Sequence, residues 1–169
     1  DEICQSLSTV FVLAGTKEIY AATMWNVFDI VEMPENGTVF DFDGLRYEVT
    51  GVLTCKVDNA LAKIVEGTLR IPSVALFNGL PFEVTAIGTS AFMDSRITTV
   101  IIPNSVKSIA NGAFSHCPEL AEIVFPSSLE YIDGFAFVDC PSLTSLFIPS
   151  SVTYIGEGAF CECEGISSI

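Results

Sequence analysis

Apolar residues in the second half of the chain recur with a long, fixed step rather than with the short period of one helix or strand. Phe114, Phe137 and Phe160 lie 23 residues apart, and Phe92 stands 22 residues before Phe114. Other residue types follow the same 23-residue step, namely Ile109, Ile132 and Ile155, with Ile87 22 residues before Ile109, then Pro103, Pro126 and Pro149, then Cys117, Cys140 and Cys163. Several residue types kept in register predict a stack of similar structural units.

Within one unit, the apolar and polar positions predict two short strands. The segment Leu143–Ile148 reads as a short strand, with Leu143, Leu146 and Ile148 expected to face the core. Pro149 ends this strand because proline donates no hydrogen bond to a sheet. The segment Val152–Ile155 predicts a second, shorter strand of the same unit.

The rest of the unit predicts a compact turn. Gly156 or its neighbours permit a tight change of direction, since glycine adopts backbone angles that other residues avoid. Ala159 and Phe160 favour a short helical turn in which alanine allows close approach and phenylalanine fills the core. Cys163 suits a small, buried, weakly polar position. The expected fold is a solenoid that is mainly β with short helical turns, built from right-handed stacked repeats with parallel short strands.

The unit SLTSLFIPSSVTYIGEGAFCEC resembles the BspA-like subclass of leucine-rich repeats, whose repeats span about 20 to 29 residues. The resemblance covers roughly residues Phe40–Ile169, and the stretches FDFDGLRYEVTG and NGLPFEVTAIGTSAF look like the usual start of such an array. It implies a leucine-rich-repeat solenoid from a bacterial, or in some cases protist, surface or secreted protein. Family members of this kind are linked to adhesion.

Three parts are expected along the chain. Residues 1–37 are interpreted as the end of a preceding repeat array followed by a helical cap and a linker. The offsets of Cys4, Leu7, Val10 and Val12 equal those of Cys117, Leu120, Ile123 and Phe125. By resemblance to the cap that closes such arrays, a short helix with Trp25 and Phe28 would cover the last core edge. Residues 38–83 form a hairpin-rich segment, and residues 84–169 hold about four repeats of an array cut at its C-terminal end.

Composition and charge exclude some classes of partner. Half of the residues are hydrophobic and the mean hydropathy is +0.53, which suffices for a packed core. The chain has 21 Asp and Glu against 7 Lys and Arg, a formal charge of −14. Such a surface repels phosphates and anionic headgroups, so a nucleic-acid partner is excluded. No stretch reaches the about 20 apolar residues that span a bilayer, so membrane insertion is not expected.

Residues able to carry catalysis or bind a metal are few. The single histidine, His116, adjoins Cys117, but this cysteine belongs to the repeated core set, so packing is favoured over a catalytic pair. Cys161 and Cys163 lack the spacing of a zinc-binding pair, and no second pair follows. Free buried thiols are favoured over disulfides between stacked units. No catalytic, cofactor-binding or metal-binding residue is predicted, and the protein is not expected to be an enzyme.

The candidate binding residues alternate with the core positions and therefore point out of the sheet. On the long strands the set comprises an apolar column, Ile101, Val124 and Phe147, and a polar column, Thr99, Glu122 and Ser145, and on the short strands it comprises Tyr131 and Tyr154. Exposed apolar stripes and tyrosines favour a partner-binding face. The alternative is that these stripes are covered by the hairpin-rich segment or are ordinary sheet surface.

The favoured function is a cell-surface or secreted repeat module that binds a protein, such as a host extracellular-matrix or serum protein or another surface protein. Solenoids offer extended faces for such binding. The alternative is a purely structural spacer in a larger multidomain surface protein. A glycan-binding or glycan-degrading module is less favoured, because the only tryptophan, Trp25, lies in the expected cap. No cofactor is expected, and the oligomeric state stays open.

Overall fold

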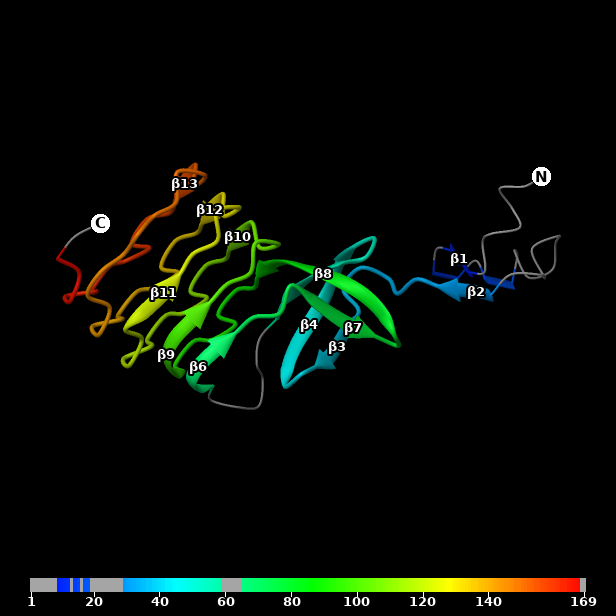
Figure 1. Ribbon diagram of the computed structural model, residues 1–169, viewed down its shortest axis with the longest axis horizontal. Coiled ribbons are helices and arrows are strands. Elements are labelled where there is room, and N and C mark those ends of the chain that lie inside the picture. Colours follow the sequence, from blue (N-terminus) through cyan, green and yellow to red (C-terminus); the bar gives the residue numbers. More distant parts are fainter. Residues whose placement is uncertain (1–8, 13, 16, 19–28, 59–64, 168–169) are drawn as a thin grey trace.

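The computed structural model describes residues 9–12, 14–15, 17–18, 29–58 and 65–167. Its C-terminal half is a β-solenoid of about four turns with parallel strands, as the repeat pattern predicts. In Figure 1 the turns lie side by side toward the C-terminus, and the hairpins occupy the middle of the molecule. Two sheets, one on each side of the coil, enclose the core of the repeats.

The first of these sheets has three parallel strands in the order β11-β9-β6. Their bounds are Glu66–Arg70 for β6, Arg96–Ile101 for β9 and Glu122–Val124 for β11. Leu69 of β6, Val100 of β9 and Ile123 of β11 stand in register, and the first two are buried while Ile123 is partly buried. Side chains alternate across a strand, so the residues on either side of these three face outward.

The second sheet has eight strands and continues from the repeats into the hairpins. Its order is β13-β12-β10-β8-β5-β4-β3, with β7 paired to β8. The repeats contribute β8 (Leu80–Ile87), β10 (Ser108–Ile109), β12 (Tyr131–Ile132) and β13 (Tyr154–Ile155). Isoleucines in register, Ile87, Ile109 and Ile132, fill the core side of this sheet, and Ile155 extends the row at its end.

Hairpins precede the array. The strands β3 (Val39–Phe42), β4 (Leu45–Gly51) and β5 (Thr54–Val57) pair in antiparallel fashion, and β7 (Val74–Phe77) pairs with β8. The turns Asp43-Gly44 and Asn78-Gly79 have positive φ at both residues, the geometry that fits two-residue hairpins. β1 (Thr9–Val12) and β2 (Asp29–Glu32) form a separate parallel pair, and the expected cap helix with Trp25 and Phe28 lies outside the described residues.

The compact turns of the repeats are not helical, contrary to the expectation for Ala159 and Phe160. Their hydrogen bonds join residues three apart, as when the Ala159 amide donates to the Gly156 carbonyl at 3.3 Å. Each turn also holds two residues in the left-handed region, which a right-handed helix does not accommodate. These pairs are Ser90 and Asp94, Gly112 and His116, Phe135 and Asp139, and Gly158 and Glu162.

The expected backbone freedom is found at the neighbouring Gly158, whose φ is +64°, and Gly156 is required for a different reason. It is not among the residues with positive φ. A Cβ atom at Gly156 would instead lie 2.7 Å from the carbonyl carbon of Asp133 and 2.8 Å from the Cα of Gly134. The neighbouring turn therefore approaches so closely that only glycine fits at this position.

The predicted strand Leu143–Ile148 keeps its pattern of burial but forms no regular strand. Leu143 and Leu146 are buried, while Phe147 between core positions is exposed. The backbone hydrogen bonds that define a strand are therefore less regular here than in β9 and β11, although the side chains face as the repeat predicts.

The core of the array is built on the phenylalanine ladder, Phe92, Phe114, Phe137 and Phe160. Neighbouring rings stack with centroids 5.2 to 5.3 Å apart and planes inclined by 13°, 4° and 1°. This spacing is close to the separation of about 4.8 Å between paired strands. One ring per turn thus fills the space between the two sheets.

Candidate functional site

The apolar column lies on the outward face of the three-stranded sheet. Ile101 of β9 stands in register with Val124 of β11, and Phe147 occupies the same position in the next repeat. Exposure rises along this column: Ile101 is half-buried, Val124 is 47% exposed and Phe147 is 81% exposed. Val124 and Phe147 thus expose apolar surface on this face, and the column ends at the half-buried Ile101.

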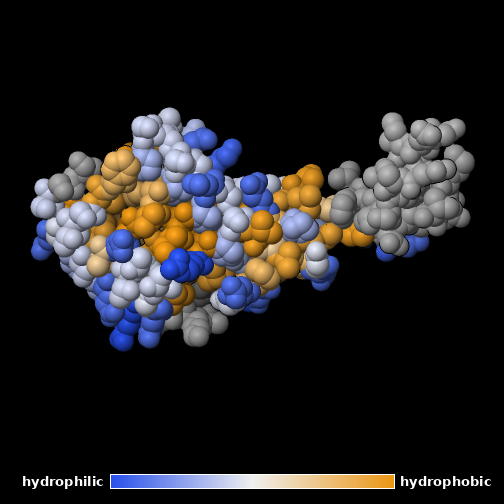
Figure 2. All heavy atoms as spheres, viewed as in Figure 1, coloured by the Kyte–Doolittle hydropathy of each residue, from blue (hydrophilic) through white to orange (hydrophobic). Residues whose placement is uncertain are grey.

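The polar column runs beside it on the same sheet. Thr99 stands in register with Glu122, and Ser145 follows at the repeat step. Glu122 and Ser145 are exposed, and Thr99 is half-buried. Figure 2 shows the result, a group of apolar side chains over β9 and β11 with hydrophilic side chains around it. A rim of polar groups around an apolar strip is typical of protein-binding surfaces.

The tyrosines lie elsewhere. Tyr131 and Tyr154 stand in register on β12 and β13, so they belong to the eight-stranded sheet, while the two columns belong to the three-stranded one. Both tyrosines are about half exposed, and with Ser108 and Asp133 they line a shallow hollow of about 280 Å³. The candidate residues therefore make two separate surfaces rather than one face (Figure 1).

Two further residues extend the columns and were missed by the repeat pattern. Arg70 of β6 stands in register with Ile101, and Thr68 stands in register with Thr99. The step from Arg70 to Ile101 is 31 residues rather than 23, because β7 and its hairpin turn are inserted between β6 and β8. An extra residue of β9, Thr98, shifts the register between Gly67 and Thr68, so no sequence period could have found these positions.

The cysteines of the array are structural. Cys117, Cys140 and Cys163 are buried, and each thiol donates to the carbonyl of a ladder phenylalanine in the preceding turn, over 3.3, 3.3 and 3.0 Å. The hydrogen bond with Cys117, together with burial, raises the pKa of Cys140 to about 12. A thiol held protonated is a poor nucleophile and a poor metal ligand.

The remaining chemical candidates do not assemble into a site. His116 is exposed at a left-handed turn position while the neighbouring Cys117 is fully buried, so the two side chains face different environments. Cys161 is exposed and Cys163 is buried, and both are free thiols. Among the described residues, no group of three or more His, Cys, Asp or Glu side chains is placed to hold a metal ion. No helix in the described ranges is long and apolar enough to cross a membrane.

The sequence of the array matches a known repeat family. The model of the BspA type leucine rich repeat region matches residues 80–169 in six copies. This match spans more than half of the chain and coincides with the solenoid. No curated protein sequence matches the chain.

Solved structures share the fold. A leucine-rich repeat protein from Bacteroides capillosus is 29% identical, with a TM-score of 0.61 over 71% of this chain and 99% of its own. One from Bacteroides ovatus is 27% identical, with a TM-score of 0.56 over 75% of this chain and 39% of its own. The pneumococcal vaccine antigen PcpA is 23% identical, with a TM-score of 0.67 over 79% of this chain and 38% of its own. The chain thus spans well under half the length of the latter two.

Proposed function

The chain belongs to the BspA-type leucine-rich repeat family, and from this premise we propose that it is a protein-binding module of a cell-surface or secreted protein. Leucine-rich repeats are generally protein-binding modules, and stacked repeats present extended surfaces for that purpose. The observation that carries the proposal is the uncovered apolar column, with Phe147 at 81% exposure. A large apolar side chain left in water is unfavourable unless a partner buries it.

The proposed partner is a protein, such as a host extracellular-matrix or serum protein or another surface protein. The apolar column would form the centre of the contact, and Thr99, Glu122 and Ser145 would form part of its polar rim. The formal charge of −14 disfavours polyanionic partners such as nucleic acids and heparin-like glycans. An extracellular or cell-surface location is supported by the family, whose members include surface and secreted proteins.

The tyrosine pair, Tyr131 and Tyr154, is proposed as a second contact surface. Tyrosine contributes a large, rigid side chain with a polar tip, which suits it to interfaces. Because these residues lie on the other sheet, one partner domain would engage either the columns or the tyrosines, whereas a partner that wraps the solenoid would engage both.

The test is capture of human serum and extracellular-matrix proteins by the immobilised protein and by two single variants, Phe147→Ser and Tyr154→Ser. The matched control is Val52→Ser, which changes a 76% exposed valine at the β4–β5 turn, far along the chain from the columns. All variants are expected to keep the melting temperature of the parent, because each replaced side chain is exposed.

The outcomes separate the functions. Loss of a captured protein with Phe147→Ser but not with Val52→Ser supports the columns as the binding face. The same loss with Tyr154→Ser alone moves the site to the second sheet. Equal capture by all four proteins contradicts both surfaces and places the binding site elsewhere on the chain. Capture by none favours the spacer function.

A further inference from the structure

The outer edge of β6 is an unpaired strand edge. Among the described strands, β6 pairs with β9 alone and ends the three-stranded sheet. In a parallel sheet, successive residues direct their backbone groups alternately to the two sides. The Ile71 amide donates to Ile101 of β9, so Leu69 and Ile71 face β9, and the backbone groups of Thr68 and Arg70 face the open side.

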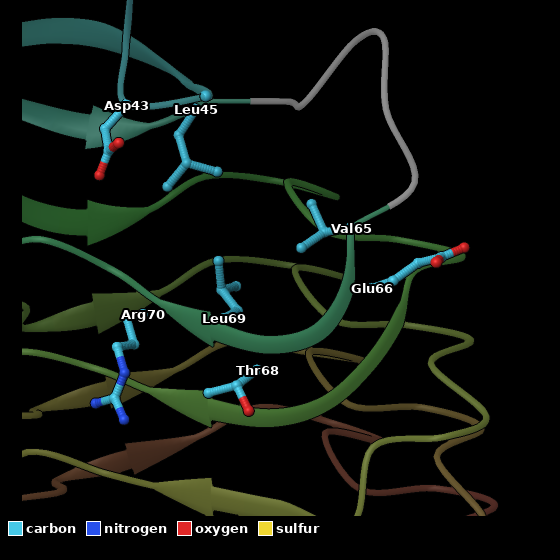
Figure 3. Close-up of a pocket in the computed structure, with 8 residues that line it drawn as sticks. Asp43, Leu45, Val65, Glu66, Thr68, Leu69 and Arg70 are labelled. Carbon is cyan, nitrogen blue, oxygen red and sulfur yellow. The ribbon is translucent and has the colours of Figure 1, made fainter.

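A groove runs along this edge. It has a volume of about 530 Å³ and lies between β6 and the β3–β4 turn at Asp43-Gly44. In Figure 3 the side chains of Leu45, Val65 and Leu69 extend into the space between the two walls. Backbone groups along one wall and apolar side chains at the floor are the two features that an added strand requires.

The charged side chains at the two ends of β6 match an extended peptide that has a basic residue near one end and an acidic residue near the other. Glu66 and Arg70 are both exposed and lie four residues apart, on the same side of the strand as Thr68 between them. Neither takes part in the ion pairs of the described residues, which are Arg46 with Asp41 and Lys56 with Glu48. Opposite charges placed across neighbouring strands are stabilising, and β9 already places Arg96 beside Glu66.

We propose that the β6 edge groove binds an extended peptide segment of a partner protein, which adds to the three-stranded sheet as a fourth strand. In a parallel orientation the segment has a basic residue beside Glu66, apolar residues beside Gly67 and Leu69, and an acidic residue beside Arg70. The apolar residues point toward Leu45 and Val65. The site shares Thr68 and Arg70 with the ends of the two columns, but its groove does not include Ile101, Val124 or Phe147. It does not depend on the proposed function.

The probe is the acetylated and amidated peptide Thr-Lys-Val-Thr-Leu-Glu-Thr, labelled with a fluorophore and titrated with the full chain by fluorescence anisotropy. Three comparison peptides accompany it. One has the reversed sequence, one exchanges Lys and Glu, and one carries N-methyl groups on the backbone amides that would face β6. The protein variants are Thr68→Pro, which removes an edge amide, Arg70→Gln, and Phe147→Ser as a control on the other surface.

Strand addition predicts saturable binding that weakens at least about tenfold with the N-methylated peptide and with Thr68→Pro, since each removes hydrogen bonds to the edge. Exchange of Lys and Glu weakens binding to the parent but has little further effect with Arg70→Gln. The Phe147→Ser variant is expected to bind the probe peptide with the same affinity as the parent protein. The Thr68→Pro result counts only if this variant has the circular dichroism spectrum of the folded parent. If the variant does not fold, the loss of affinity with the N-methylated peptide tests strand addition by itself.

Three results would overturn the proposal. Equal affinity for the N-methylated and parent peptides would show that backbone pairing is absent. No binding of the parent and reversed peptides would show that the charges of Glu66 and Arg70 serve only to protect the edge from pairing. A dimer that light scattering detects in the parent but not in Thr68→Pro would assign the edge to a second copy of the chain instead.

Discussion

The aromatic residues form two cores that differ in regularity. In the array, the phenylalanine ladder stacks rings whose planes are inclined by at most 13°. In the hairpin-rich segment, Phe40 contacts Tyr47, Phe77 and Phe82 at centroid distances of 5.0 to 5.9 Å, with planes inclined by 21° to 54°. Both cores are buried, so aromatic rings need not stack in parallel to be buried.

The difference follows from how the strands are related. Parallel strands in successive turns are related by a simple shift, so each ring repeats the position of the one before it. The antiparallel hairpins bring rings together from strands of opposite direction and different register, and the ring pairs are stacked, tilted or edge to face. A repeat therefore constrains the shape of its core far more tightly than a hairpin cluster does.

The largest expected effect is on the ladder. Phe137→Ala removes a fully buried ring that stacks on Phe114 and Phe160, and we expect a loss of about 3 to 5 kcal/mol in the free energy of unfolding. Urea unfolding monitored by circular dichroism measures it. The control is Phe147→Ala, which removes an exposed ring outside the core. Its free energy of unfolding should stay near that of the parent. A loss below about 1 kcal/mol for Phe137→Ala would contradict the ladder.

A smaller loss is expected where adjacent turns approach most closely. Gly156→Ala places a Cβ against the backbone of Asp133 and Gly134, and overpacking of this kind costs about 1 to 3 kcal/mol. The change should lower the melting temperature, whereas Ser150→Ala, an exposed position of the same repeat, should not. Unchanged stability of Gly156→Ala would show that the turns separate at little cost.

In the hairpin core the expected effect has the opposite sign. The Tyr47 hydroxyl is buried and has no hydrogen-bond partner among the described residues. Burial raises the pKa of this phenol, so the neutral form is kept. Tyr47→Phe removes the unpaired group and should stabilise the protein by about 1 kcal/mol in urea unfolding. A destabilisation would instead indicate that a bound water satisfies the hydroxyl.

The smallest expected effect on stability is that of alkylating the exposed thiol of Cys161 at pH 8. Iodoacetamide at pH 8 should modify the exposed Cys161 in the folded protein but not the buried Cys55, Cys117, Cys140 and Cys163, as peptide mass spectrometry can show. Modification of Cys161 should leave the melting temperature unchanged. Labelling of Cys140 at the same rate as Cys161 would contradict the buried arrangement.

The same thiols give a pH dependence. Burial raises the pKa of Cys55 to about 12 from the usual 9.0, and the pKa of Cys140 is raised to a similar value. The folded state therefore holds protons that the unfolded chain releases first. This contribution to stability is complete below about pH 9 and is lost as the pH rises toward 12. Cys55→Ala and Cys140→Ala should each flatten the decline measured by thermal unfolding between these values.

The repeat step alone determined most of the array. The positions of Phe137, Ile132 and Cys140 in the core, the parallel strands and the outward direction of Val124 and Phe147 all follow from residues kept in register. This works because each turn meets the same neighbours as the last, so a side chain that suits one turn suits the next.

Only the tertiary structure revealed the features that the 23-residue repeat step does not predict. The register of Arg70 with Ile101 depends on a hairpin inserted between their strands and on an extra residue, Thr98, in β9. The separation of the tyrosine pair from the two columns depends on which sheet each strand joins. The need for glycine at Gly156 arises from the backbone of the adjacent turn, one repeat step away, because the two backbones approach more closely than a Cβ atom allows. None of these can be read from the residue types alone, since each is set by how segments meet in the folded chain.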